Sequence, residues 1–124
     1  SALKYLHGKG FLHLDLKPSN IISQGGVLRL IDLGIARRPG RCEAGIGTDS
    51  YMAPEQARGG MMTSATDVFG LGAVLYEAAT GAAAFRSNGG RRYYEQLVRR
   101  ADPVSKRRRL PVPIFAPCGN PLSF

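Results

Sequence analysis

Two polar segments, one ending at Asn20 and the other starting at Asp32, flank a stretch that has room for only one β-hairpin. Residues 21–22 and 27–31 have the apolar composition of two short strands, and the Gln-Gly-Gly sequence at 24–26 is typical of the turn between them. A hairpin brings its first and last residues to the same end. We therefore expect the oxygen atoms of Asn20 and Asp32 to be available to one shared ligand.

The same two segments carry an acid, a lysine and two oxygen-bearing side chains. Transfer of the γ-phosphoryl group of ATP needs a group that orients a hydroxyl, a cation that neutralises phosphate charge, and ligands for Mg²⁺, because the protein does little covalent chemistry itself. A lone Asp or Asn in a loop is usually a turn residue. The functional interpretation therefore depends on the four residues together: Asp15, Lys17, Asn20 and Asp32.

Four motifs occur in the order in which protein kinases carry them. Residues 13–20 (His-Leu-Asp-Leu-Lys-Pro-Ser-Asn) and 32–34 (Asp-Leu-Gly) are similar to the catalytic loop and the metal-binding triplet. Residues 47–55 look like the end of an activation segment, and residues 67–72 like the start of the helix that follows it. The chain therefore resembles a protein kinase. Its Leu-Lys-Pro-x-Asn catalytic loop is similar to that of serine/threonine kinases, and its arginine-, alanine- and glycine-rich composition indicates a bacterial source.

This resemblance implies an enzyme that phosphorylates Ser or Thr hydroxyls of a protein substrate, with ATP and Mg²⁺ as cofactors. Asp15 and Lys17 are the implied catalytic residues: Asp15 accepts or orients the hydroxyl proton, and Lys17 neutralises charge on the γ-phosphate. Asn20 and Asp32 are the implied magnesium ligands. Together with Lys17 they are also the implied nucleotide-binding residues.

The resemblance also implies supporting roles for three residues outside this set. Thr48 is expected to hydrogen-bond Asp15 and Lys17, and so to shape the acceptor site. Asp67 is expected to brace the catalytic loop through backbone amides. His13 is expected to be structural, with its ring packed beneath the second residue of the metal-binding triplet.

Three positions depart from the family pattern or lack a partner. Leu14 replaces an arginine that in many kinases binds a phosphorylated loop, and residues 37–47 contain no Ser, Thr or Tyr, so switching by loop phosphorylation is not expected. Leu33 replaces the usual phenylalanine and is expected to fill the same apolar slot. Glu55 would pair with a downstream arginine that this sequence does not identify. Two hydroxyl residues after the loop remain candidate targets of modification: Thr48 and Ser50.

The expected fold is α+β and mainly helical: part of the C-terminal lobe of a protein kinase, with a short β-hairpin and an activation segment. The 124 residues are roughly half of what two lobes require, and they include neither a Gly-x-Gly-x-x-Gly loop nor a Val-Ala-Ile-Lys type strand. The small lobe is therefore expected to lie outside the chain. Residues 1–102 are predicted to form a partial catalytic domain, and residues 103–124 a basic, Pro-rich tail that is truncated or irregular.

Apolar periodicity predicts three helices, at residues 2–7, 66–80 and 93–100. The second is apolar over most of its circumference, which predicts a central, buried helix that ends at Gly81. Residues 35–53 show no period and predict a long functional loop. The residues of this apolar pattern in the second helix are Val68, Leu71, Val74, Leu75 and Ala78. In the third helix, the side chains expected to face inward are Tyr94, Leu97 and Val98.

Charge and cysteine content narrow the function classes. The net charge is +8, and residues 86–109 hold nine basic side chains against two acidic ones. The basic run at 106–109 lacks interleaved aromatic residues, which argues against a nucleic-acid partner and for a solvated linker.

Cys42 and Cys118 have no metal-site or disulfide spacing and indicate free thiols in a reducing cytosol. No apolar stretch is long enough for a membrane span. The predicted location is the cytoplasm, with the cytoplasmic part of a longer membrane-anchored kinase as the alternative.

A catalytically inactive kinase remnant, acting as a scaffold for a protein partner, is the competing hypothesis. The helix at 67–80 is expected to lack neighbours on part of its surface, and the apolar patch that this leaves would suit a partner or favour aggregation. Retention of the acid, lysine and metal-ligand residues argues for the enzyme.

Overall fold

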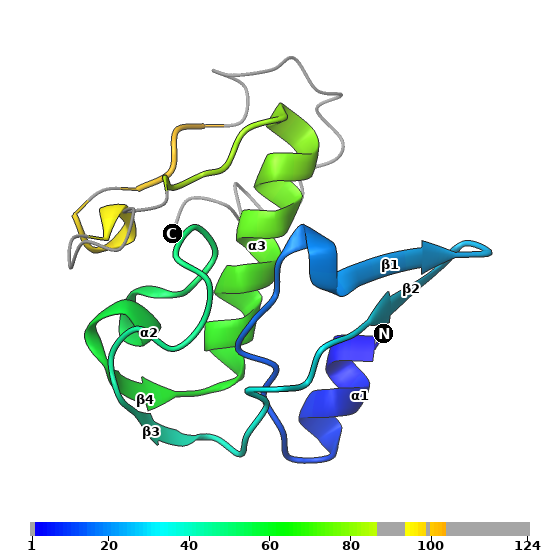
Figure 1. Ribbon diagram of the computed structural model, residues 1–124, viewed down its shortest axis with the longest axis horizontal. Helices are drawn as coiled ribbons and strands as arrows, with labels where there is room; N and C mark the ends of the chain where they lie inside the picture. Colours follow the sequence, from blue (N-terminus) through cyan, green and yellow to red (C-terminus); the bar gives the residue numbers. More distant parts are fainter. Residues whose placement is uncertain (1, 87–93, 99, 104–124) are drawn as a thin grey trace.

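The computed structural model describes residues 2–86, 94–98 and 100–103 (Figure 1). In these residues a long helix, α3, runs through the middle, and the shorter elements lie around it. The elements in chain order are α1 (Ala2–Gly8), the 3₁₀ turn η1 (Pro18–Asn20), β1 (Ile21–Gln24), β2 (Val27–Leu30), β3 (Gly40–Cys42), α2 (Pro54–Arg58), β4 (Gly60–Met62), α3 (Ser64–Thr80) and the 3₁₀ turn η2 (Glu95–Leu97).

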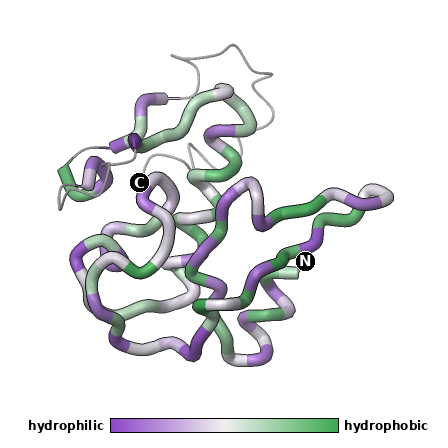
Figure 2. Tube along the Cα trace, in the orientation of Figure 1, coloured by the Kyte–Doolittle hydropathy of each residue, from purple (hydrophilic) through white to green (hydrophobic). Residues whose placement is uncertain are grey.

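The predicted hairpin is present as the antiparallel pair β1–β2. Ile21 pairs with Leu30 and Gln24 with Val27, so the turn is Gly25-Gly26 alone and Gln24 belongs to the strand. Both turn glycines have positive φ, 60° and 78°, which matches the tight turn that suits the twist of a two-residue hairpin. Figure 2 shows hydrophobic colour along both strands although the hairpin projects outward. Val27 and Leu28 are in fact 57% and 63% exposed.

Strands β3 and β4 form a second small sheet. Strand β3 lies within residues 35–53, the segment expected to be irregular, and β4 follows that segment. Gly40 pairs with Met62 and Cys42 with Gly60, and an isolated bridge joins Leu12 to Arg37. The prediction that residues 35–53 contain no regular structure is therefore wrong at β3. The sequence gives no sign of this strand because it is three residues long, starts with glycine and pairs with a distant segment rather than a neighbour.

Helix α3 begins two residues before its predicted start and ends where predicted. At its N-terminus, Thr66 Oγ1 accepts a hydrogen bond of 3.0 Å from Thr63 N. At its C-terminus, Gly81 has φ 78° and donates its N–H to Glu77 O at 2.7 Å. Glycine is favoured there because a side chain at positive φ would be strained.

The prediction that α3 is a buried helix is wrong for part of its apolar surface. Val68 and Leu75 are 56% and 49% exposed, Ala78 is exposed, and Leu71 and Val74 are only partly buried. With apolar residues round most of the helix, neighbours rather than hydrophobicity select the buried side. A Cβ atom at Gly70 would lie 3.3 Å from Leu16 Cβ, so a small residue permits close packing there. The buried residues of α3 are Thr66, Asp67, Phe69, Gly70, Gly72, Ala73 and Tyr76.

The buried apolar side chains form two clusters. The larger joins α3 to the segment after it, with the rings of Phe69 and Phe85 stacked at a centroid distance of 5.8 Å. The smaller contains Leu12, Leu14 and Met62, with Ile35 and Cys42 packed against it. The second cluster fixes the segment expected to be the catalytic loop against β4. Cys42 is a free thiol, as expected, and accepts a hydrogen bond from Arg37 Nη1 at 3.5 Å.

The predicted helix at 93–100 is a short 3₁₀ turn over Glu95–Leu97 in the part that the structure describes. Leu97 and Val98 are exposed, at 39% and 62%, whereas Gln96 is buried, so the predicted inward face is wrong. Gln96 turns inward because its amide donates to Asp49 O and Met52 O at 2.7 and 2.9 Å. The basic run at 106–109, Cys118 and the rest of the predicted tail after Pro103 lie outside the described residues.

The described part has three α-helices, of 7, 5 and 17 residues, and two two-stranded sheets, in agreement with an α+β class. The expectation of a mainly helical chain stays a prediction. No helix among these residues combines the length and the apolar character needed to cross a membrane.

Candidate active site

Asp67, near the N-terminus of α3, holds the backbone of residues 13 and 14. Its Oδ2 accepts a hydrogen bond from His13 N and its Oδ1 accepts one from Leu14 N, both at 2.8 Å, and its side chain is 1% exposed. His7 Nε2, on α1, donates to Oδ2 at 2.7 Å. These bonds compensate for burial of the carboxylate. The predicted bracing of the loop through backbone amides by Asp67 is what the structure shows.

Leu14 has a backbone conformation that non-glycine residues rarely adopt. Its φ is 67°, in the left-handed region, and its side chain is buried at 3% exposure. Such a conformation costs about 1–2 kcal/mol and persists only where the surroundings hold it. Here Asp67 binds the N–H of Leu14, and Gln56 Nε2 donates to its carbonyl oxygen at 2.7 Å. The strained residue immediately precedes Asp15.

His13 is fully buried and has hydrogen-bond partners at both ring nitrogens. Asp15 N donates to Nδ1 at 3.1 Å, so Nε2 carries the proton and donates to Ile31 O at 3.0 Å. These bonds connect the catalytic-loop segment to the end of β2 and support the structural role predicted for His13. The expectation that Leu33 fills an apolar slot is wrong, because its side chain is 55% exposed.

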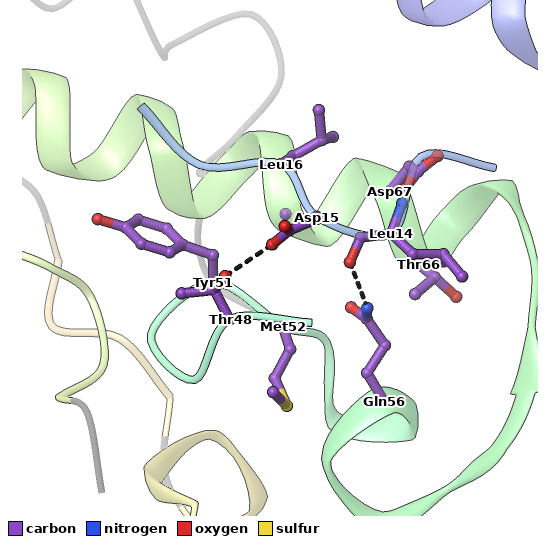
Figure 3. Close-up of a pocket in the computed structure, with 10 residues that line it drawn as sticks. Leu14, Asp15, Leu16, Thr48, Tyr51, Met52, Gln56, Thr66 and Asp67 are labelled. Atoms are coloured by element: carbon purple, nitrogen blue, oxygen red, sulfur yellow. Dashed lines mark hydrogen bonds between the residues drawn. The ribbon is translucent and has the colours of Figure 1, made fainter. Parts of the chain in front are cut away.

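The carboxylate of Asp15 has a different partner for each oxygen, and Figure 3 shows the one from Thr48. Thr48 Oγ1 donates to Oδ1 at 2.6 Å, and Lys17 Nζ lies 3.8 Å from Oδ2. The Asp15 and Lys17 side chains are 16% and 29% exposed, so both remain accessible to a substrate. The structure therefore brings together the two predicted catalytic residues and the threonine predicted to orient them. Thr48 reaches Asp15, and Lys17 approaches the other carboxylate oxygen.

Asn20 and Asp32 flank the open end of the β1–β2 hairpin. Asn20 is buried at 4% exposure and donates from Nδ2 to Asp15 O at 2.9 Å, while its backbone oxygen accepts from Ile31 N at 2.9 Å. Asp32 is exposed, has φ 58°, and accepts from Gly34 N at 3.2 Å.

The donor chemistry of this pair fits Mg²⁺. The carboxamide nitrogen of Asn20 is directed to the loop, which leaves the oxygen Oδ1 as its ligating atom, and Asp32 provides a carboxylate. Among the described residues no group of three His, Cys, Asp or Glu side chains could hold a metal. A two-ligand site is what Mg²⁺ uses when waters and phosphate oxygens complete its coordination.

Glu55 has a hydrogen-bond partner in the described residues, although this partner is a threonine and not the arginine that the resemblance implies. Thr66 Oγ1 donates to Glu55 Oε2 at 2.8 Å, which connects α2 to the first turn of α3. The Ala-Pro-Glu sequence at 53–55 is thus connected to the same helix that holds residues 13 and 14 through Asp67.

Tyr51 and Glu77 form a contact that the sequence analysis missed. Tyr51 Oη donates to Glu77 Oε1 at 2.8 Å. Burial, together with this hydrogen bond and the negative charge of Glu77, raises the pKa of Tyr51 from 10.0 to about 12. No sequence signal marks the pair, since the two residues are 26 positions apart.

Gln56, on α2, is another residue whose contacts were not predicted from the sequence. Its side chain is 3% exposed and reaches the carbonyl of Leu14 (Figure 3). Glutamine is usually a surface residue, so its position after the Ala-Pro-Glu sequence gives no signal of burial.

Asp15, Thr48, Gln56 and Asp67 line a pocket built from four segments: residues 14–16, the turn around Thr48, α2 and the N-terminal part of α3 (Figure 3). Its interior is packed without space for a water molecule. The lining residues are Leu14, Asp15, Leu16, Thr48, Tyr51, Met52, Gln56, Thr66, Asp67 and Gly70.

Comparison with known proteins adds two findings. The family model described as "Protein kinase domain" matches residues 1–114 of this chain. The chain is also 40% identical over 116 residues to the serine/threonine-protein kinase PknB of Mycolicibacterium smegmatis, an alignment that covers 87% of this chain and 18% of that protein.

Two further relatives give similar values. The serine/threonine-protein kinase AfsK of Streptomyces griseus is 46% identical over 90 residues, which is 68% of this chain and 11% of AfsK. The probable serine/threonine-protein kinase PknB of Bifidobacterium longum is 42% identical over 89 residues, 65% of this chain and 13% of that protein. The chain thus spans less than a fifth of the length of each of these relatives.

Proposed function

Because the chain belongs to the protein kinase domain family, we propose that it carries the catalytic and metal-binding segments of a serine/threonine protein kinase. Such an enzyme transfers the γ-phosphoryl group of ATP to a Ser or Thr hydroxyl of a protein substrate. The observation that carries the proposal is the arrangement at Asp15, whose two carboxylate oxygens face Thr48 and Lys17 while Asp67 fixes the backbone just before it.

Asp15 is the group that orients the substrate hydroxyl and accepts its proton. The hydrogen bond from Thr48 to Oδ1 restricts rotation of the carboxylate, so that Oδ2 is the oxygen presented to the hydroxyl. A carboxylate that is positioned to accept a proton increases the rate by about 10²–10⁴-fold.

Lys17 supplies positive charge beside the same oxygen. Its ammonium group, 3.8 Å from Asp15 Oδ2, is close enough to the acceptor position to bind an oxygen of the transferred phosphoryl group. Preorganised charge of this kind stabilises the transition state without having to reorient during the reaction.

Mg²⁺ would be held by Oδ1 of Asn20 and the carboxylate of Asp32, with phosphate oxygens of ATP and water as its other ligands. When bound, the metal neutralises charge that develops on the phosphate oxygens. Asn20 also connects this site to the acid, since its Nδ2 binds the carbonyl oxygen of Asp15. Movement of the metal ligand and of the acid is thereby coupled.

The chain is best placed in the C-terminal lobe of a kinase, because each of its four motifs belongs to that lobe. The loop that covers the phosphates and the lysine that contacts them belong to the other lobe. We propose that the enzyme works in the cytoplasm, where ATP is available, either free or as the cytoplasmic part of a membrane-anchored kinase.

A scaffold that binds a protein partner is the second candidate, and the exposed apolar side of α3 favours it. Val68 and Leu75 are seven residues apart, which is two helical turns, and both are about half exposed. An unpaired apolar stripe of this kind suits a partner surface.

The discriminating experiment is an assay of the protein as its source expresses it, with γ-labelled ATP and a basic protein as acceptor. The kinase proposal predicts label on Ser and Thr, none on Tyr, and loss of labelling when Mg²⁺ is chelated. Absence of labelling from a folded, ATP-saturated protein would contradict the proposal and favour the scaffold.

A further inference from the structure

Gln56 lies on α2, and its side chain makes hydrogen bonds to the N-cap of its own helix and to two other segments of the chain. Its Nε2 donates to Leu14 O at 2.7 Å and to Ile46 O at 3.0 Å, and its Oε1 accepts from Ala53 N at 2.9 Å. Both N–H groups and the carbonyl oxygen of the carboxamide are therefore used. The side chain is 3% exposed, so water cannot replace these bonds.

The hydrogen bond from Gln56 to Leu14 holds the residue immediately before Asp15. Leu14 has φ 67°, and its carbonyl carbon belongs to the peptide bond that leads into Asp15. Asp67 holds the N–H of Leu14 and Gln56 holds its carbonyl oxygen. The peptide groups before and after Leu14 are thus fixed from two different helices, and this orientation determines where the Asp15 side chain begins.

The bond to Ile46 acts on the other side of the carboxylate. Ile46 is two residues before Thr48, which donates to Asp15 Oδ1 at 2.6 Å. Between them, Gly47 has φ 125°, and a Cβ atom there would lie 2.9 Å from Gln56 Nε2 and 3.1 Å from Leu14 O. The turn that carries Thr48 therefore approaches the catalytic loop at a distance that only glycine allows, and Gln56 bridges the two.

A packing role alone does not account for these contacts. An apolar side chain of the same length would fill the space, yet it would leave two buried carbonyl oxygens and one N–H without partners. Glutamate would keep the acceptor for Ala53 N but would place negative charge against the oxygens of Leu14 and Ile46. A neutral amide is the side chain that satisfies all three groups.

We infer that Gln56 is a positioning residue that sets the separation between Asp15 and Thr48. It acts through the backbone of Leu14 and Ile46 and touches no substrate. The kinetic consequence rests on the proposed kinase function, whereas the structural consequence does not.

The kinetic test compares Gln56→Met and Gln56→Glu with Gln96→Met, in the protein as its source expresses it. Gln96 is the comparison: it is a buried glutamine whose Nε2 also donates to two backbone carbonyls, Asp49 O and Met52 O, so both of these bonds go to the segment after Thr48, whereas those of Gln56 join Leu14 to Ile46. Each variant is assayed well below its unfolding temperature, with the folded fraction measured by circular dichroism.

Both Gln56 variants are expected to lower kcat by about 10- to 100-fold, because small misplacements of catalytic groups have effects of this size. The KM for ATP should stay close to that of the unmodified protein, and Gln96→Met should lower kcat less than Gln56→Met, because its bonds do not reach Leu14. Equal losses of kcat in Gln56→Met and Gln96→Met, or losses explained by the folded fraction alone, would overturn the inference.

Hydrogen–deuterium exchange supplies a readout that does not depend on activity. In Gln56→Met, amides of residues 13–17 and 45–49 should exchange faster together, while those of β1 and β2 keep their rates. Unchanged exchange in either segment would overturn the positioning role even if the unmodified protein had no kinase activity. If the unmodified protein has no kinase activity but both segments exchange faster in Gln56→Met, the positioning role is supported and the kinase proposal is contradicted.

Discussion

Asp67 shows how one carboxylate can fix a loop that has no regular structure of its own. It is 1% exposed and accepts hydrogen bonds from two consecutive backbone amides and from His7. The sequence predicted the role of Asp67 through its motif, since Asp67 opens the fourth kinase-like segment.

Asp67→Asn is expected to destabilise the protein by about 2–3 kcal/mol, because one of the two backbone amides would face an NH₂ group instead of a charged oxygen. Asp102→Asn, a substitution outside the site, serves as the control and should change stability by much less. Denaturant unfolding measures both. Equal stabilities of the two variants would show that the bonds from Asp67 do not hold the loop.

Tyr51 provides a test based on pH. Its phenol donates to Glu77, and its pKa is raised to about 12. Because the folded-state pKa lies above the unfolded one, this contact stabilises the protein fully below pH 10, and the contribution is lost as the pH rises from 10 towards 12.

The expected result is a late-titrating tyrosinate absorbance in the unmodified protein, with a midpoint about two units above that of a free phenol. It should be missing from Tyr51→Phe. A difference titration between the two proteins isolates this tyrosine from the others. A midpoint near 10 would show that the phenol is not held by Glu77.

At the scale of single residues, motif resemblance identified the polar side chains of the kinase-like segments. It did not identify the buried glutamines that hold the backbone around them. Asp67 has the backbone contacts expected from its motif, and Thr48 makes the expected hydrogen bond to Asp15. Gln56 and Gln96 were missed because a buried glutamine is defined by carbonyl groups far away in sequence. The partner of Glu55 was missed for the same reason, since Thr66 gives no local signal.

At the scale of elements, α3 is the structural support of the site. Its first turn holds the catalytic loop through Asp67 and binds α2 through Thr66, and its middle packs on Leu16 at Gly70. Periodicity predicted the existence of this helix and its end at Gly81. It did not predict the buried face, because glycine and alanine pack closely without adding to an apolar pattern.

Gly70→Leu tests this close packing. A Cβ at position 70 already lies 3.3 Å from Leu16 Cβ, so a larger side chain must displace the catalytic loop or the helix. We expect a destabilisation of about 1–3 kcal/mol, typical of overpacking. Gly8→Leu, near the end of α1, is the matched control, because a Cβ there meets nothing within 4 Å.

Thermal unfolding distinguishes the two glycine variants. The account predicts a clear fall in melting temperature for Gly70→Leu and little change for Gly8→Leu. Similar melting temperatures would mean that α3 and the catalytic loop are not in tight contact at Gly70.

The two sheets show where element prediction works and where it stops. The β1–β2 hairpin is local, its strands are apolar, and its two-glycine turn is a strong signal. The β3–β4 pair joins segments 18 residues or more apart through backbone bonds alone, so side-chain pattern carries no information about it. The α2 helix is similarly short, at five residues, and is held by Gln56 and Glu55 rather than by periodicity.

At the scale of the whole molecule, the exposed side of α3 determines how the 124 residues should behave when prepared alone. Val68 and Leu75 lie on this helix at about half exposure, together with partly buried Leu71. Such a stripe favours self-association. We expect the separate chain to associate and to unfold over a broad temperature range.

Replacing Val68 and Leu75 by Gln should reduce this association while the helix remains, because Gln has good helix propensity and no apolar surface to bury. Light scattering measures association, and circular dichroism measures helix content. Sharp cooperative unfolding of a monomer before any substitution would contradict the expectation.

The central claim is that Asp15 is the residue that accepts the hydroxyl proton in a serine/threonine protein kinase, and the kcat of Asp15→Asn tests it most directly. The substitution keeps the shape of the side chain and the hydrogen bond from Thr48, but it removes the proton acceptor. In the protein as its source expresses it, we predict a fall in kcat of about 100-fold or more, with Mg²⁺ and ATP saturating. Asp102→Asn should retain activity. An Asp15→Asn variant with unchanged kcat would contradict the account.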